Sequence, residues 1–343
     1  MNSGHSMPTI SNLNQVQAQG IAPDLALIRA ARQRIASRIH RTPVVTSSNL
    51  DEIAGAKLFF KCENLQKTGS FKIRGATNAV FLLTDEEAKH GIVAPSSGNH
   101  AAAIAQAARW KGIPAYIVMP SNSSAAKKRA VEAYGGKITE CEPNIQSREA
   151  VTAEMIARTA SHLIHPYNDA RIIAGQGTAA LELLEEIPDL DIVMAPVSGG
   201  GLLSGTAIAA KGLRPEIRLI GAEPLNADDA YRSLASGKIE AAASAETVAD
   251  GLRAVLCPMT FSILREKVDQ ISLVSEDEIV EAMHLLWERL KLVIEPSGAV
   301  AAAPALFQKI GAAGKKIGII LSGGNLDLRN LPFQNQKSGS SRS

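Results

Sequence analysis

Cysteine is scarce in this sequence. Its 343 residues contain three cysteines, Cys62, Cys141 and Cys257, at wide spacings and without a CxxC pair. An odd number of distant cysteines excludes a complete disulfide framework and offers no zinc-site or redox-pair spacing. We therefore expect free thiols, buried or half-buried, in a reducing compartment.

Long apolar runs and an excess of one charge are also absent. No segment approaches the ~20 consecutive apolar residues of a membrane span, and the polar first twenty residues lack the core of a signal peptide. The formal net charge is +2, which argues against a dedicated binder of nucleic acid or membrane surfaces. We expect a cytoplasmic protein with neither partner, and disordered ends at residues 1–20 and 334–343.

What is present is an alternation of short apolar runs with Ala/Leu-rich segments. Helices are predicted at His100–Trp110 and Ala170–Glu186. Several of the intervening runs are continuously apolar, as in strands covered on both faces. The predicted strands are Lys57–Lys61, Gly91–Ala94, Ala115–Met119, Lys137–Glu140, Asp191–Ala195, Ile217–Ala222 and Lys316–Leu321. The rhythm predicts an α/β fold with mainly parallel sheets flanked by helices.

Three predicted strands end in similar loops. Pro-Ser-Ser-Gly-Asn-His follows the strand at 91–94, Pro-Val-Ser-Gly-Gly-Gly the strand at 191–195, and Ser-Gly-Gly-Asn the strand at 316–321. Ligands of open α/β sheets bind at the carboxyl ends of strands. A single such loop is typical of a tight turn, whereas three together indicate one shared ligand site.

The loop at 198–201 has the composition of a phosphate cradle. Its glycines allow close backbone approach, and the apparent helix Leu202–Lys211 presents free N–H groups at its start. Neither the Walker A pattern nor the GxGxxG pattern is present. The phosphate therefore belongs to a ligand other than ATP or NAD held in their usual ways.

Lys72 stands at the start of a predicted helix, beside Phe71 and two residues after Ser70, a candidate N-cap. A charged lysine is unfavourable at a helix N-terminus, which would lower its pKa and favour attack of the neutral amine on a carbonyl. The local pattern also fits an ordinary surface lysine.

The ordered set of motifs resembles the fold type II pyridoxal-phosphate family. Within it, the sequence is similar to the branch of serine racemase, serine/threonine dehydratase and 3-hydroxyaspartate ammonia-lyase. The resemblance covers roughly residues 25–328. Its motifs are ENLQKTGSFKIRGA at 63–76, SSGNHA at 96–101, AGQGT at 174–178, SGGGLLSG at 198–205, GAEP at 221–224, ADG at 249–251, EPSGA at 295–299 and LSGGN at 321–325.

The resemblance implies a tryptophan synthase beta-like fold with two open, twisted, mainly parallel sheets. Residues 22–90 and 167–330 would form a large domain that binds pyridoxal 5'-phosphate. Residues 91–166 would form a small mobile domain that binds substrate. A homodimer is expected, because dimers are usual in this branch.

The resemblance also implies roles for cofactor residues. Lys72 would form the Schiff base with the cofactor, Phe71 would pack near its ring, and Asn99 would hydrogen-bond its 3-oxygen. Ser322 would face the pyridine nitrogen, where a neutral hydroxyl favours elimination. The phosphate would be bound by the backbone amides of Ser198, Gly199, Gly200, Gly201 and Leu202.

A further set of residues would handle the substrate. Its carboxylate would be held by Ser96, Ser97, Asn99 and His100, and Arg148 would reach it in a closed form. Lys72 would remove the Cα proton, the 3-hydroxyl would leave, and a 2-oxo acid and ammonia would result. Ser97 would lie on the opposite cofactor face, where a proton donor permits racemisation, although carboxylate binding explains that serine equally well.

Glu223-Pro-Leu-Asn-Ala-Asp-Asp229 offers several oxygens after a strand, which suits a hard cation or a solvated turn. The resemblance favours a divalent-metal site made by Glu223, Asp229 and the carbonyl of Ala227. Mg²⁺ is expected there, with Ca²⁺ or Mn²⁺ as alternatives.

The sequence departs from the branch at two informative positions. Ser198 replaces the first glycine of the phosphate loop, so a side chain must be accommodated. Ala254 replaces a serine near the substrate, and neighbouring Arg253 could bind a second carboxylate or lie on the surface.

The predicted function is a dehydratase that converts L-serine, L-threonine or 3-hydroxyaspartate to a 2-oxo acid and ammonia. A serine or aspartate racemase, alone or combined with this activity, is the alternative, and β-replacement fits less well. A non-catalytic amino-acid or cofactor-binding protein would be expected to lack the lysine, and Lys72 is present.

Overall fold

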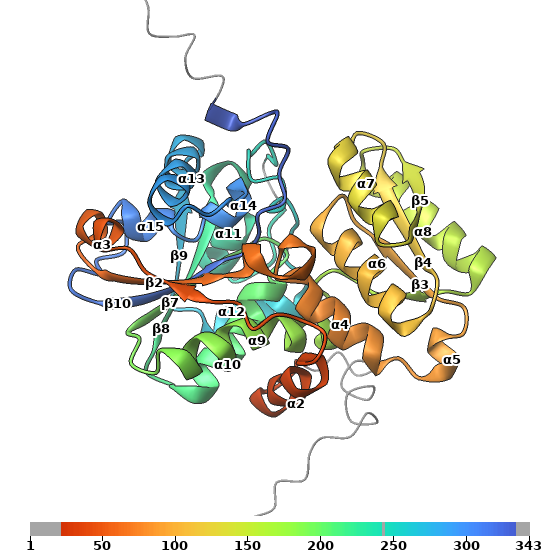
Figure 1. The fold of residues 1–343 in the computed structure, drawn as a ribbon, viewed down its shortest axis with the longest axis horizontal. Coiled ribbons are helices and arrows are strands. Elements are labelled where there is room, and N and C mark those ends of the chain that lie inside the picture. The colour runs from red at the N-terminus through yellow and green to blue at the C-terminus, as the bar shows by residue number, and fades with distance from the viewer. Residues whose placement is uncertain (1–21, 242–243, 334–343) are drawn as a thin grey trace, which may run out of the picture.

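The computed structural model describes residues 22–241 and 244–333; the predicted disordered ends lie outside these residues. Two sheets organise the chain (Figure 1). The first runs in the order β1 (Val44–Val45), β2 (Lys57–Cys62), β10 (Lys316–Leu321), β7 (Ile192–Pro196), β8 (Arg218–Pro224), β9 (Gln270–Val274). The second runs β5 (Gly136–Cys141), β4 (Ala115–Pro120), β3 (Ile92–Pro95), β6 (His162–Leu163).

Both sheets are parallel except for the β1–β2 pair, as the apolar runs predicted. Each of the seven predicted strands is present, with ends shifted by up to two residues. The prediction missed β1 and β6, whose two residues are too short to show a period, and β9, which lies at an edge of its sheet.

Helices cover both faces of the six-stranded sheet. One face carries α2 (Leu25–Ile35), α4 (Lys72–Leu82), α9 (Ala170–Glu186), α10 (Gly201–Leu213) and α12 (Pro258–Lys267). The other carries α3 (Ser48–Ala54), α13 (Glu276–Leu290), α14 (Pro296–Ala299) and α15 (Ala303–Leu306). Helix α11 (Asp229–Ser236) lies beside the edge strand β9 and packs against α12, with Ala230 in the same core as Ile263 and Leu264. The 3-10 turns are η1 (Glu63–Leu65), η2 (Lys67–Gly69) and η3 (Leu225–Ala227).

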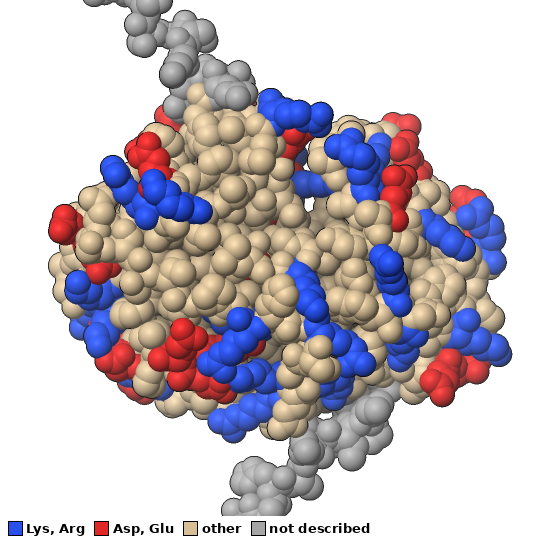
Figure 2. Space-filling view, in the orientation of Figure 1, with Lys and Arg blue, Asp and Glu red and all other residues tan. Residues whose placement is uncertain are grey.

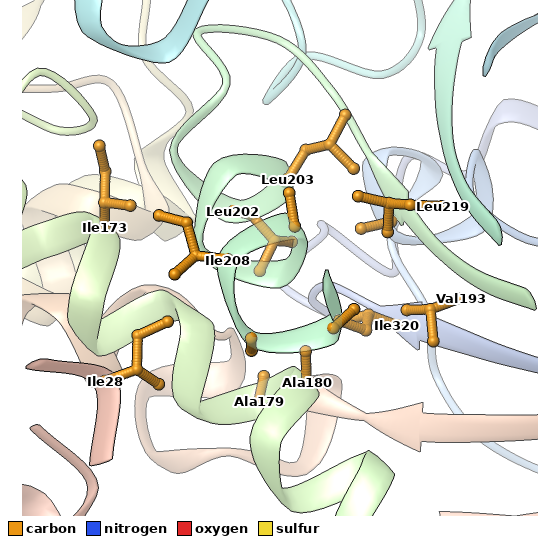
Figure 3. Packing of buried hydrophobic residues seen from close by; sticks show 14 of the residues in the cluster. Ile28, Ile173, Ala179, Ala180, Val193, Leu202, Leu203, Ile208, Leu219 and Ile320 are labelled. Atoms are coloured by element: carbon orange, nitrogen blue, oxygen red, sulfur yellow. The ribbon is translucent and has the colours of Figure 1, made fainter. Parts of the chain in front are cut away.

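Alternation along the central strands separates two cores. Val193 of β7 packs with α9 and α10 (Figure 3), whereas its neighbours Ile192 and Met194 pack on the opposite face with α13. Successive strand side chains point to opposite faces, so one continuously apolar strand supplies both cores.

The four-stranded sheet is flanked by α5 (Asp85–Ala88), α6 (Asn99–Lys111), α7 (Ala125–Ala133) and α8 (Ile145–Thr159). Its strands all come from residues 92–163, inside the segment predicted as the small domain. We call the six-stranded sheet with the helices that pack on it the six-stranded half. The four-stranded sheet with its flanking helices is called the four-stranded half. The domain boundaries and the mobility expected from the sequence stay predictions.

Figure 2 shows the surface hollowed at the junction of the two halves, with charges of both signs spread over this face. Among the described residues, no helix is long and apolar enough to cross a membrane.

Candidate functional site

Lys72 begins α4, as predicted, but Ser70 is not its N-cap. The capping position is Phe71 (φ −55°, ψ −22°), whereas Ser70 is extended (φ −161°, ψ 162°). Ser70 is held extended by an antiparallel bridge to Gly323. Its buried Oγ has no hydrogen-bond partner within the part of the chain that the structure describes. The lysine is therefore placed by a contact with the loop after β10, not by a local cap.

The Lys72 amine lies among backbone and aromatic atoms. Its Nζ donates to Pro166 O at 3.3 Å and lies 5.1 Å from the centre of the Phe71 ring. Burial lowers the pKa of Lys72 to about 8. The expected direction is confirmed, but its cause is desolvation. Near pH 7 such an amine is still mostly protonated, but its neutral fraction is far larger than that of an ordinary lysine.

The glycine loop is crowded by Tyr167. A Cβ on Gly199 would stand 2.5 Å from ring atoms of Tyr167, and one on Gly201 would stand 2.9 Å from Tyr167 Cβ. Gly200 is in the left-handed region (φ +89°) at the N-cap of α10. The loop leads directly into a 13-residue helix whose first N–H groups are free of intrahelical partners. These residues therefore fit a phosphate group.

Ser198 is accommodated by Ala254. Its hydroxyl donates to Ala254 O at 3.1 Å and accepts from Ala254 N at 2.8 Å. The two departures from the family pattern thus meet, because the serine side chain ties the glycine loop to the 253–256 segment. Neighbouring Arg253 is exposed and donates to Thr247 O at 2.7 Å.

The loop between β3 and α6 reaches the six-stranded half. Asn99 Nδ2 donates to Glu295 Oε1 at 2.7 Å, and its Oδ1 accepts from Asn325 at 2.9 Å. Burial raises the pKa of Glu295 to about 7. Ser96 is half-buried and Ser97 is exposed. The loops after β3 and β10 therefore come together, as expected for a shared site.

His100 is buried and close enough to Lys72 for the two charges to interact. Its Nε2 lies 3.3 Å from Ile164 O, and burial lowers its pKa to about 3. Burial also lowers the pKa of His165 to about 4, with the charges of Lys72 and Arg148 acting in the same direction. The carboxylate of Asp169 acts on His165 in the opposite direction. Both imidazoles are nevertheless neutral at pH 7. Arg148 lies in the first turn of α8, close enough to His165 for its charge to be felt there.

Ser322 follows β10 and is buried. Its Oγ donates to Ser297 O at 3.3 Å, and its carbonyl accepts from Phe71 N at 3.0 Å. The hydroxyl is a neutral group that faces a backbone carbonyl.

The segment 164–167 also contributes to the site, although no sequence motif predicted it. Ile164 and Pro166 supply carbonyls to His100 and Lys72, and the ring of Tyr167 packs edge-on against His165, with centroids 4.6 Å apart. The segment follows β6, so its position at a strand end was the available signal. It lacks the Gly/Ser/Asn composition that marked the other loops, and β6 is only two residues long.

Behind Lys72, four buried charges anchor α4. Arg74 donates to Glu63 Oε2 at 2.7 Å and to Glu182 Oε2 at 2.8 Å, and Lys61 donates to that same Glu182 oxygen at 2.7 Å. Each of these side chains is at most 4% exposed. Two cations and two carboxylates balance in charge, which makes their burial tolerable.

The AGQGT motif packs helices together. A Cβ on Gly175 would stand 2.5 Å from Gly75 Cα of α4, and one on Gly205 of α10 would stand 2.5 Å from Gly177 N. Gln176 Oε1 accepts from Gly75 N at 3.1 Å. Helix α9 therefore holds the helix that carries Lys72 and the helix that follows the glycine loop.

A cavity of about 110 Å³ lies beside the site. Its lining includes Gly98, Asn99, Lys127 and Asn325, from both halves, but not Lys72.

The predicted metal residues are brought together around the start of α11. Glu223 accepts from Ala230 N at 3.0 Å and Tyr231 N at 2.8 Å, so it caps this helix. Burial raises the pKa of Glu223 to about 8 and that of Asp229 to about 6. Asp229 Oδ2 is buried and has no hydrogen-bond partner in the described residues. No cluster of three or more His, Cys, Asp or Glu side chains suited to a metal occurs among those residues.

Comparison with known proteins gives a consistent result. Residues 35–323 match the family model described as pyridoxal-phosphate dependent enzyme. The chain is 50% identical over 317 residues to a serine racemase of Oryza sativa (91% of this chain, 94% of the relative). It is 51% identical over 304 residues to the beta-hydroxyaspartate dehydratase of Paracoccus denitrificans (89% and 96%).

The structure of maize serine racemase superimposes with a TM-score of 0.89 at 49% identity, covering 92% of this chain and 98% of that one. This likeness confirms the predicted fold class, with its two mainly parallel sheets. Because the family model spans most of the chain and both curated relatives align over nearly its whole length, this chain belongs to the family of pyridoxal-phosphate dependent enzymes.

Proposed function

We propose that this enzyme is an ammonia-lyase that converts a small 3-hydroxy amino acid, namely L-serine, L-threonine or 3-hydroxyaspartate, to a 2-oxo acid and ammonia. The observation that carries the proposal is the Lys72 amine at the junction of the strand-end loops, with a pKa of about 8. A base with a pKa near the working pH is suited to proton transfer.

Pyridoxal phosphate, when bound, supplies an electron sink that acidifies the Cα–H bond of an amino acid. Lys72 would hold the cofactor and serve as the base for the Cα proton. Phe71 would pack near the ring, and Asn99 would hydrogen-bond the 3-oxygen with the donor hydrogen not used by Glu295. The phosphate would be bound by the backbone amides of Ser198, Gly199, Gly200, Gly201 and Leu202.

Ser322 supports elimination in particular. A hydroxyl, unlike a carboxylate, cannot hold a full proton on the pyridine nitrogen. A serine hydroxyl is neutral at any working pH, and the contact with Ser297 O holds it in place. Ser322 would therefore leave the ring nitrogen largely unprotonated, which favours prompt loss of the 3-hydroxyl group.

The substrate carboxylate would be bound by Ser96, Ser97, Asn99 and His100. Because His100 is neutral, it would contribute a hydrogen bond, and Arg148 would supply positive charge. Support for a hydroxy amino acid comes from the relative named beta-hydroxyaspartate dehydratase.

Racemisation of serine or aspartate is the second candidate, favoured by Ser97. Its side chain is exposed at a strand-end loop, where it can exchange protons with water. Relatives named serine racemase are about as similar as the dehydratase.

We also propose a divalent cation, Mg²⁺ in the first instance, at Glu223, Asp229 and the carbonyl of Ala227. The unpartnered Asp229 Oδ2 supports it, because a buried carboxylate oxygen without a partner is costly. Glu223 already accepts two helix N–H groups, so water would complete the shell. The homodimer and the cytoplasmic location stay predictions.

A substrate panel tests the proposal. Purified enzyme with pyridoxal phosphate and Mg²⁺ would receive L- and D-serine, L-threonine, L-aspartate and the 3-hydroxyaspartate isomers, with 2-oxo acid and enantiomer ratio both followed. Oxo-acid formation that dominates supports the lyase. Enantiomer exchange that is faster and is lost in Ser97→Ala supports the racemase. No conversion of any substrate would refute both.

A further inference from the structure

An ion pair joins the two halves next to the candidate site. Lys127 of α7, in the four-stranded half, donates to Asp250 Oδ2 in the ADG segment 249–251. The side chains are 18% and 45% exposed, respectively. Gly251 N donates to Ser297 Oγ at 3.0 Å, which fastens this segment to α14 of the six-stranded half. The pair can therefore form only when the two halves are close together.

The aliphatic part of Lys127 lies over the loop between β3 and α6. A Cβ on Gly98 would stand 3.1 Å from Lys127 Cδ, 3.3 Å from Cε and 3.4 Å from Nζ. Gly98 lies between Ser97 and Asn99, so the lysine crosses the backbone of this loop and reaches Asp250 beyond it. On the other side, the loop is held by the Asn99–Glu295 and Asn325–Asn99 hydrogen bonds.

We propose that Lys127 is a positioning residue that, through Asp250, holds the Ser96–Asn99 loop in the arrangement that binds substrate. The inference rests on the proposed function of this loop in holding the substrate carboxylate. When only a fraction of the molecules has the competent arrangement, the apparent affinity falls by that fraction. An exposed pair contributes modestly, and the two amide contacts remain, so we expect a change of about two- to fivefold.

The test compares charge removal, charge reversal and conservative replacement in the pyridoxal-phosphate holoenzyme. Lys127→Met and Asp250→Asn should each raise KM by about two- to fivefold, with kcat and the cofactor absorbance spectrum little changed. Lys127→Arg, and the double variant Lys127→Glu with Asp250→Lys, should return KM toward the wild-type value. Added salt should raise KM more in the wild type than in Lys127→Met, because only the wild type has the Lys127–Asp250 pair to be screened.

Lys128, the next residue of α7, supplies the matched control. It pairs with Glu140 of β5 at similar exposure, 24% and 54%, but entirely within the four-stranded half. Lys128→Met and Glu140→Gln should leave KM unchanged. An effect as large as that of Lys127→Met would show a general dependence on surface charge and overturn the proposal.

The free amino acid glycine, added as a ligand, provides a binding measurement that does not depend on turnover. It has the amine and carboxylate of a substrate but no leaving group. Its Kd, from the change in cofactor absorbance, should follow the same pattern as KM. If the wild type converts no amino acid of the panel, the proposed function fails while the glycine titration still tests Lys127. Unchanged glycine affinity in Lys127→Met and Asp250→Asn, or a charge-reversed pair no better than the single variants, would overturn the inference.

Discussion

Replacing Gly200 by alanine should damage the glycine loop in two separable ways. The residue has φ +89°, where an L side chain costs about 1–2 kcal/mol. The new Cβ would also stand 2.7 Å from Thr260 Cβ and 2.9 Å from Leu256 Cδ2. Both neighbours are buried, and Thr260 Oγ1 accepts from Cys257 N at 3.1 Å, so the threonine cannot turn away freely. Overpacking of this kind adds about 1–3 kcal/mol.

Gly237 offers a control with the same backbone demand and no crowding. It has φ +77° at the C-cap of α11, with nothing within 4 Å of an added Cβ. Gly237→Ala should therefore lose only the conformational part, about 1–2 kcal/mol. Gly200→Ala should lose about 2–5 kcal/mol in total. Urea unfolding of the two cofactor-free variants measures the difference.

The affinity for pyridoxal phosphate should also differ between Gly200→Ala and Gly237→Ala. If the loop amides bind the phosphate, moving them apart weakens charge-assisted hydrogen bonds, each contributing about 1.5–3 kcal/mol, so a tenfold or greater loss is expected for Gly200→Ala. Gly237→Ala should bind pyridoxal phosphate normally, and unphosphorylated pyridoxal should bind Gly200→Ala about as well as it binds the wild type. Unchanged affinity of Gly200→Ala for pyridoxal phosphate would refute the assignment of the phosphate site.

Three other results are expected. Lys72→Ala should lose both the cofactor absorbance band and turnover. In the cofactor-free wild type, the rate of cofactor incorporation should rise with pH through about 8, because deprotonation of Lys72 frees the attacking amine. A midpoint of this pH profile near the pKa of an ordinary lysine would contradict the assignment. Glu182→Gln should cost about 3–5 kcal/mol in urea unfolding, because it leaves a net positive charge buried. Exposed Glu185→Gln on the same helix should cost under about 1 kcal/mol, and equal losses would argue against a role of the buried cluster. Mg²⁺ should raise the Tm of the wild type but not of Asp229→Asn, and an equal rise in both would place the ion elsewhere.

Much of the site could be predicted because its parts are local. The stretch around Lys72 and the loop at 198–201 carry their chemistry within a few neighbouring residues. The continuously apolar strands at 192–195 and 317–320 report burial on both faces, and hence a parallel sheet. The roles assigned to individual residues by resemblance stay predictions, because the structure shows where these residues lie and not what they bind.

The features that the sequence did not predict depend on contacts between residues far apart in the chain. Ser70 resembles a local helix cap, yet its conformation is set by Gly323, more than 250 residues later. No sequence feature near Ser198 predicts that its hydroxyl forms hydrogen bonds with the backbone of Ala254.

The sequence alone determined the family, the cofactor chemistry and the α/β pattern, since motifs and periodicity are properties of short segments. Only the tertiary structure decided how the Lys72 amine is desolvated, which charges balance Arg74 behind it, and which residue of the six-stranded half meets Lys127. These features depend on burial and on contacts between distant segments. Burial changes the free energy of a charge only once the fold has removed water from around it.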